Sequence, residues 1–260
     1  MILRGDYSSD VLRTTVNVQF IIPEKCDGPF KVTYLLHGLH GNQGSWMDYS
    51  MLPFYGKDYN TIFVMPETGR SFYYDLKHGR NFSTFILDEL PLICKKIFNI
   101  SDKREDTAIM GNSMGGYGAL KLALTKPQQY GFCAAISTAC LYFKPVLDAL
   151  REDASAYLKT GAEAQEIMKD LSAIFGEDLK YRPDGDILEL INNFPAGKPK
   201  PKIYATCGTE DIEMIKDNQR FRDEMKDKSF DFTYEEWSGV HDWNFFNDAL
   251  KKSLEQWFKG

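Results

Sequence analysis

The 260-residue sequence has few of the residues that build disulfide frameworks and metal centres. Its five cysteines are an odd number and include no C-x-x-C pair, so neither a disulfide scaffold nor a zinc site is indicated. Four of them lie in apolar surroundings, where we expect small buried hydrophobic residues. Histidine is scarce too, with four residues, so any reaction that needs an imidazole has few candidates. The cysteines are Cys26, Cys94, Cys133, Cys140 and Cys207.

An excess of positive charge and long apolar runs are also missing. The chain has 31 basic and 37 acidic residues, a net charge of −6, and no basic cluster. This balance argues against a nucleic acid or an anionic membrane surface as partner. The first residues contain no hydrophobic signal core, and no apolar run approaches membrane-spanning length. We therefore expect a cytoplasmic protein, and whether it forms a homo-oligomer stays open.

The chain does contain short apolar segments that alternate with helical ones. Hydrophobic residues make up 43% and charged residues 26%, which is typical of a globular protein, and the length suffices for one large core. This alternation predicts a single α/β domain over residues 1–260, with a mostly parallel sheet covered by helices on both faces. Strands are expected at 15–21, 31–37, 61–65, 107–110, 132–137, 202–207 and 230–236, and helices at 83–98, 119–124, 212–226 and 242–258.

Residues 144–193 differ in character from the rest of the chain. They are rich in Ala, Leu, Glu, Asp and Lys and contain no convincing strand. We expect several short helices inserted between two strands of the sheet, with breaks near Gly161, Gly176 and 183–185.

Residues 109–118, IMGNSMGGYG, contain a G-x-S-x-G motif in the setting of a nucleophile elbow. An apolar run precedes the motif and helix formers follow it. The glycines allow a strand to turn sharply into a helix, with the Ser113 hydroxyl presented at the apex. The motif therefore predicts a nucleophilic serine, followed along the chain by an acid and then a histidine.

Both further groups are present in that order. A serine hydroxyl is a weak nucleophile unless a base removes its proton. His241 is the one histidine that follows Ser113, and it lies between the last predicted strand and the last helix. Asp211 and its neighbour Glu210 come directly after a strand, and either carboxylate suits the orientation of an imidazole.

The loop 37–41, with sequence HGLHG, is the second candidate for the catalytic machinery. A tetrahedral intermediate needs two backbone N–H donors for its oxyanion. We expect one donor from Met114, directly after the serine, and the other from Leu39. His37 and His40 have no Cys or carboxylate ligands near them in sequence, so we expect hydrogen bonds that hold the loop rather than a metal site.

The segments LLHGLHGNQGSW, VMPETG, DELP, GNSMGGYGALKLAL, GTED and GVHDWNFF together resemble an esterase family of α/β-hydrolases. This group is related to esterase D and S-formylglutathione hydrolase, and the likeness is greater to tributyrin esterases and cinnamoyl or feruloyl esterases. The antigen 85 acyltransferases are more distant. The resemblance covers roughly residues 15–258, is weakest over 144–200, and implies the α/β-hydrolase fold.

The resemblance also assigns expected roles. The nucleophile, acid and base of the family map to Ser113, Asp211 and His241, which favours Asp211 over Glu210. Asn112 departs from the residues usual before the serine, and we expect its side chain to point away from the nucleophile. The oxyanion donors map to Leu39 and Met114.

For substrate binding, the resemblance implies that residues 144–193 form a small lid over the acyl or alcohol pocket. We expect that pocket at the loops where the strands end, because aromatic and apolar residues gather there. The expected substrate-binding residues are Gly38, Trp46, Leu141 and Trp243.

The resulting hypothesis is a serine carboxylesterase acting on short-chain acyl or hydroxycinnamoyl (feruloyl-type) esters, with a small-molecule ester as its partner. No metal or organic cofactor is implied. Hydrolysis of an S-formylglutathione-type thioester and acyl transfer stay open, because the same residues suit all three reactions. A non-catalytic binding protein is the alternative from another class, and the ordered serine, acid and histidine argue against it.

Overall fold

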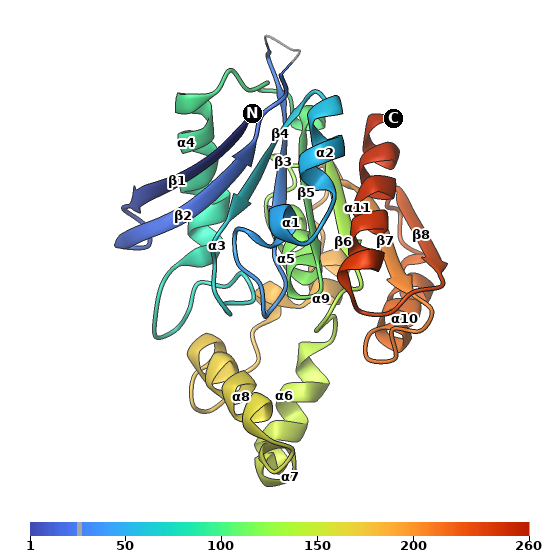
Figure 1. The fold of residues 1–260 in the computed structure, drawn as a ribbon. Helices are drawn as coiled ribbons and strands as arrows, with labels where there is room; N and C mark the ends of the chain where they lie inside the picture. Colours follow the sequence, from blue (N-terminus) through green and yellow to red (C-terminus); the bar gives the residue numbers. More distant parts are fainter. Residues whose placement is uncertain (25–27, 260) are drawn as a thin grey trace.

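The computed structural model describes residues 1–24 and 28–259, and its centre is an eight-stranded sheet (Figure 1). Cys26 lies outside the described residues. The strand order is β1-β2-β4-β3-β5-β6-β7-β8, with antiparallel pairs β1–β2 and β2–β4 and parallel pairs elsewhere. The predicted α/β-hydrolase fold with a mostly parallel sheet is confirmed. The strands are β1 (Ile2–Ser9), β2 (Thr14–Ile21), β3 (Lys31–Leu36), β4 (Thr61–Pro66), β5 (Thr107–Asn112), β6 (Phe132–Ile136), β7 (Lys202–Gly208) and β8 (Phe232–Trp237).

Helices cover both faces of this sheet, because the central strands carry apolar side chains on both faces. Along β4, Ile62 and Val64 join one hydrophobic cluster, whereas Phe63 and Met65 join the other. Helices α4, α5 and α10 pack on the first face, and α1, α2 and α11 pack on the second (Figure 1). Among the described residues, no helix is both long and apolar enough to cross a bilayer. These helices are α1 (Ser45–Asp48), α2 (Leu52–Tyr55), α4 (Leu90–Ile97), α5 (Met114–Thr125), α10 (Ile215–Met225) and α11 (Trp243–Phe258).

The edge strand β1 was not expected from the sequence. It pairs with β2 over its full length, from Ile2 opposite Ile21 to Ser9 opposite Thr14. Most of its residues are exposed, so neither face carries the apolar alternation by which a strand is predicted.

The helix predicted over 83–98 forms, and Pro91 is accommodated without a break. The chain runs through α3 (Phe82–Thr84), a π-helical turn (Phe85–Glu89) and α4, with Pro91 in the first turn of α4. Proline cannot donate to the carbonyl four residues earlier, which here is that of Leu87. That oxygen accepts a hydrogen bond from Lys126 Nζ at 3.0 Å, so it keeps a partner.

The segment 144–193 folds into helices, with breaks where the sequence indicated them. Gly161 (φ 134°) and Gly176 (φ 88°) flank α8 in backbone conformations that favour glycine. Figure 1 shows α6, α7 and α8 set apart from the sheet, whereas α9 packs against α5. The helices are α6 (Phe143–Glu152), α7 (Ala154–Leu158), α8 (Ala162–Phe175) and α9 (Ile187–Asn192), with a 3₁₀ turn at Pro183–Gly185.

Candidate active site

Ser113 lies at a sharp turn between the end of β5 and the start of α5. Its backbone has φ 55° and ψ −120°, a conformation that non-glycine residues seldom adopt. The flanking glycines permit it, because a Cβ at Gly111 would lie 2.4 Å from the Gly115 carbonyl oxygen. A Cβ at Gly115 would lie 2.4 Å from the carbonyl oxygen of Leu36. The G-x-S-x-G sequence therefore folds into the predicted elbow, which raises the serine at the end of the strand.

His241 is oriented by a buried carboxylate. Its Nδ1 lies 2.7 Å from Asp211 Oδ2, and the Asp211 side chain is 1% exposed. An ionised carboxylate can only accept, so Nδ1 carries the proton and Nε2 is left free to act as a base. The imidazole also packs edge-on against Phe246, with ring centroids 5.0 Å apart. These contacts fix both the tautomer and the plane of the ring.

Glu210, the alternative acid, has a different role. Its carboxylate accepts a hydrogen bond from the backbone N–H of Gly239 at 2.5 Å, and this bond lowers the pKa of Glu210. Glu210 therefore holds the loop that carries His241, whereas Asp211 contacts the imidazole itself.

A cavity of about 530 Å³, here called the Ser113 cavity, brings the candidate residues together. Ser113 and His241 line it, together with Leu39 and Met114. Met114 is the first residue of α5, so its N–H has no intrahelical partner and is available to an oxyanion. Asp211 is buried behind His241 and is not part of the lining.

The buried side chain of His37 holds the loop that carries Leu39 through hydrogen bonds. The backbone N–H of Thr68 donates to His37 Nε2 at 3.2 Å, so Nδ1 carries the proton and donates to the Gly38 carbonyl at 2.9 Å. Burial lowers the pKa of His37, which favours this neutral form. The hydroxyl of Tyr73 donates to the His37 carbonyl at 2.8 Å. The expected role of His37 in holding the loop agrees with these contacts.

His40 joins the same loop to the helical segment. It is exposed, and its Nε2 lies 3.0 Å from Glu163 Oε1 on α8. Arg70 contacts the same carboxylate at 3.2 Å and also reaches Asp170 at 2.8 Å. Three polar contacts thus connect α8 to loops at the carboxyl edge of the sheet.

Of the four expected substrate-binding residues, two line the Ser113 cavity and two do not. Gly38 and Trp243 are part of its wall. Trp46 is 1% exposed, its Nε1 donates to the Leu36 carbonyl, and its ring packs against Trp243. Leu141 is 1% exposed in the core on the α5 side of the sheet. Trp46 and Leu141 are therefore not part of the cavity wall, because both side chains turn inward from their loops to complete the core.

Much of the cavity wall comes from residues outside the expected substrate-binding set. Asn112 was expected to point away from the nucleophile, yet it lines the cavity and is 3% exposed. On α8, the lining residues recur every fourth position and so share one helix face. That spacing was the available signal, but it does not reveal which face meets the cavity. The lining residues from α6 and α8 are Phe143, Val146, Glu163, Ile167 and Leu171.

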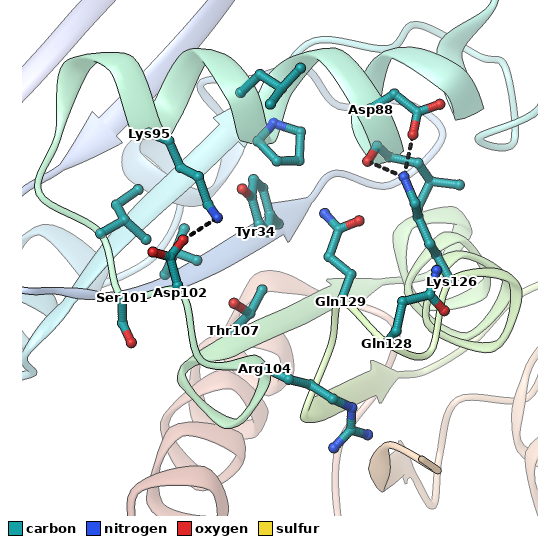
Figure 2. A pocket seen from close by; sticks show the side chains of 15 residues that line it. Tyr34, Asp88, Lys95, Ser101, Asp102, Arg104, Thr107, Lys126, Gln128 and Gln129 are labelled. Atoms are coloured by element: carbon teal, nitrogen blue, oxygen red, sulfur yellow. Dashed lines mark hydrogen bonds and ion pairs between the residues drawn. The ribbon is translucent and has the colours of Figure 1, made fainter. Parts of the chain in front are cut away.

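A second cavity, of about 440 Å³, lies at the opposite edge of the sheet, where β3 and β5 begin (Figure 2). Thr107, the first residue of β5, lines it beside α4. Its lysines already have carboxylate partners, since Lys95 pairs with Asp102 and Lys126 pairs with Asp88. None of the predicted catalytic residues lines this cavity. The candidate chemistry therefore belongs to the Ser113 cavity.

Comparison with known proteins shows which enzymes share this sequence and fold. An acetyl esterase of Caldicellulosiruptor saccharolyticus is 29% identical, over 98% of this chain and 97% of that protein. FphF, a fluorophosphonate-binding serine hydrolase of Staphylococcus aureus, superposes with a TM-score of 0.85 at 25% identity, covering 99% and 98% of the two chains. The S-formylglutathione hydrolase FrmB of the same species gives a TM-score of 0.82 at 25% identity, with the same coverage. Residues 9–256 match the family described as "Putative esterase". The chain thus belongs to this esterase family, and it is a carboxylic ester hydrolase with the α/β-hydrolase fold.

Proposed function

We propose that this enzyme is a serine carboxylesterase that hydrolyses short-chain acyl or hydroxycinnamoyl esters through an acyl-enzyme on Ser113. The observation that carries the proposal is the hydrogen bond of 2.7 Å between His241 and Asp211, beside a cavity that His241 and Ser113 both line. The elbow geometry of Ser113 supports its role as nucleophile.

In the acylation half-reaction, His241 Nε2 takes the proton of Ser113 Oγ as that oxygen attacks the ester carbonyl carbon. The N–H groups of Leu39 and Met114 stabilise the resulting oxyanion, and one such donor is commonly worth about 10²–10³ in rate. The tetrahedral intermediate collapses, the carbon–oxygen bond to the alcohol breaks, and the imidazolium of His241 gives its proton to the departing alcohol.

Deacylation repeats these steps with water. His241 removes a proton from a water molecule, whose oxygen attacks the acyl carbon and forms a second tetrahedral intermediate. Collapse of this intermediate breaks the bond to Ser113 Oγ, which recovers its proton from the imidazolium. The free acid leaves, and the buried charge of Asp211 stabilises the imidazolium in both halves.

The cavity walls support small organic esters as substrates. The rings of Phe72 and Phe143, which line the cavity, pack with centroids 5.5 Å apart. Tyr49 and Trp243, which also line it, pack with centroids 5.5 Å apart. Aromatic walls accommodate both a short acyl chain and a hydroxycinnamoyl group. The acetyl esterase relative supports a short acyl group. The segment 144–193, whose α6 and α8 line the cavity, is proposed to act as its lid.

Thioester hydrolysis is the second candidate, since the structural likeness to an S-formylglutathione hydrolase supports it. The chemistry of the two reactions differs only in the leaving group, so the same serine, histidine and oxyanion donors would serve. Acyl transfer to an added alcohol is a further alternative on the same acyl-enzyme.

Hydrolysis rates on a substrate panel test the proposal. The panel contains p-nitrophenyl acetate, butyrate and octanoate, methyl ferulate and S-formylglutathione, each with the wild type and with Ser113→Ala. We expect serine-dependent hydrolysis that is fastest on short acyl or feruloyl esters. Fast hydrolysis of the thioester alone would favour the second candidate, and full activity of Ser113→Ala would contradict the mechanism.

A further inference from the structure

The charged groups that line the Ser113 cavity are acidic. Glu163 on α8 and Glu213 on the loop after β7 contribute carboxylates to its wall. Among residues 1–24 and 28–259, no lysine or arginine lines this cavity, and its ionisable nitrogens are the imidazoles of His40 and His241. The two carboxylates come from separate elements, so two parts of the chain contribute negative charge to this cavity.

The charge of Glu163 is held in place by its contacts. Hydrogen bonds from His40 and Arg70 lower the pKa of Glu163, so its carboxylate stays ionised near neutral pH. Arg70 does not cancel this charge, because its guanidinium also pairs with Asp170 at 2.8 Å. One guanidinium therefore pairs with two carboxylates. Arg70, Glu163 and Asp170 together keep a net negative charge whenever the imidazole of His40 is neutral.

Glu213 has no ion-pair partner in the part of the chain that the structure describes. The residue is exposed, and it forms no hydrogen bond or ion pair with the rest of the described chain. It follows Asp211 by two positions, so it belongs to the loop that orients the catalytic imidazole.

The remaining wall of the cavity is largely apolar, which strengthens the effect of these charges. Ile167 and Leu171 extend the same face of α8 that carries Glu163, and Met214 and Phe246 line the side near His241. A concave surface of low polarity focuses the field of its charged groups and screens it less than an open surface does.

We propose that the Ser113 cavity selects esters whose acyl and alcohol groups are neutral or cationic and discriminates against anionic ones. This inference rests on the proposed esterase function and names its substrate class. It also separates the two candidate reactions, because glutathione carries two carboxylates against one ammonium group. An S-glutathione thioester therefore meets like charge in this cavity.

Three acetate esters of similar size isolate the effect of charge from that of shape. Choline acetate ends in a trimethylammonium group, 3,3-dimethylbutyl acetate ends in the neutral group of the same shape, and 2-sulfoethyl acetate ends in a sulfonate. We expect kcat/KM to fall in that order, by roughly fivefold to tenfold at each step at low ionic strength. The steps shrink in high salt, because mobile ions screen exposed charges.

Single charge removals assign the effect to the two carboxylates. Glu213→Gln should reduce each step by about half on a logarithmic scale, and Glu163→Gln should do the same. Glu166→Gln is the matched control, because Glu166 lies on α8, pairs with Lys169 and does not line the cavity. The hydrolysis of neutral 3,3-dimethylbutyl acetate reports whether any of these variants has damaged the enzyme itself.

The outcomes separate this inference from the proposed function. The wild type could hydrolyse the neutral ester through Ser113 but show equal kcat/KM for all three esters, or a higher value for the sulfonate. The charge selection would then be wrong and the esterase function would stand. If Glu166→Gln changes the ratios as much as Glu213→Gln does, the cavity carboxylates are not its source. If the wild type hydrolyses no ester, the proposed function fails and the selection fails with it.

Discussion

The buried imidazole of His37 donates from Nδ1 to the carbonyl oxygen of Gly38, 2.9 Å away, in the loop that carries Leu39. His37 is 1% exposed, and its other nitrogen is occupied by Thr68. The loop proposed to hold the oxyanion is therefore positioned by a group that lies beneath it. We expect the position of the Leu39 N–H to depend on His37.

Replacement of His37 by alanine should impair catalysis more than substrate binding. Without the imidazole, the Gly38 carbonyl and the Thr68 N–H lose buried partners, and the free energy of unfolding falls by about 1–3 kcal/mol. A shifted Leu39 N–H weakens the oxyanion contact, so kcat should fall about 10–100-fold with a smaller change in KM. Steady-state kinetics and urea unfolding measure both effects. An unchanged kcat would contradict the role of His37 in positioning the loop.

The same residue should make stability depend on pH. Burial lowers the pKa of His37 in the folded state, whereas the unfolded chain has an ordinary histidine near 6.5. Below about pH 6.5 the unfolded state therefore binds a proton that the folded state does not, and stability falls as the pH decreases.

The contribution of His37 to this slope is at most about 1.4 kcal/mol per pH unit, and it disappears below the folded-state pKa. Urea unfolding of the wild type and of His37→Gln between pH 5 and 8 isolates it as the difference of the two slopes. Parallel curves would show that the pKa of His37 is the same in the folded and unfolded states, which would contradict this account.

The two adjacent acids should differ sharply in their effect on turnover. Asp211→Asn removes the charge that fixes the His241 tautomer, so kcat should fall by about 10³–10⁴. Glu210→Gln removes an equal charge one residue away. Because Glu210 contacts the Gly239 N–H instead of the imidazole, most activity should remain. Rates on p-nitrophenyl acetate compare the two. Equal losses would contradict the assignment of Asp211.

The length of acyl chain that the enzyme accepts should depend on Ile167. This half-buried residue lies on the face of α8 that lines the Ser113 cavity. Ile167→Trp should lower the octanoate-to-acetate ratio of kcat/KM about tenfold, because the larger ring occupies cavity space, and Ile167→Ala should raise it. Gln165→Ala serves as control, since Gln165 lies on α8 but does not line this cavity. If neither change at Ile167 alters the octanoate-to-acetate ratio, α8 does not limit the length of the acyl chain.

The sequence predicted the elbow because its signal is local. Glycines at 111 and 115 are required by backbone contacts within a few ångströms. Asp211 and His241 were indicated because each comes shortly after a predicted strand. The central strands were predicted because burial on both faces makes them continuously apolar.

The features that the sequence did not indicate depend on contacts between distant parts of the chain. Whether Trp46 faces the cavity or the core is decided by Trp243 and the Leu36 carbonyl, not by its own neighbours in sequence. The edge strand β1 has no apolar pattern, since only β2 determines its place. Likewise, the spacing of four residues from Glu163 to Leu171 indicates a helix face, but only the folded structure shows that this face lines the Ser113 cavity.

The central claim is that Ser113 becomes acylated during turnover, and the most direct test is the mass of the enzyme caught with substrate. Acid-quenched samples of the wild type mixed with excess p-nitrophenyl acetate should show a mass increase of one acetyl group on the peptide that contains Ser113. The same experiment with Ser113→Ala should show none, and with His241→Ala the acetyl group should form far more slowly. Steady hydrolysis by the wild type with no acetyl group on Ser113 at any time point, or with acetylation of another residue, would contradict the account.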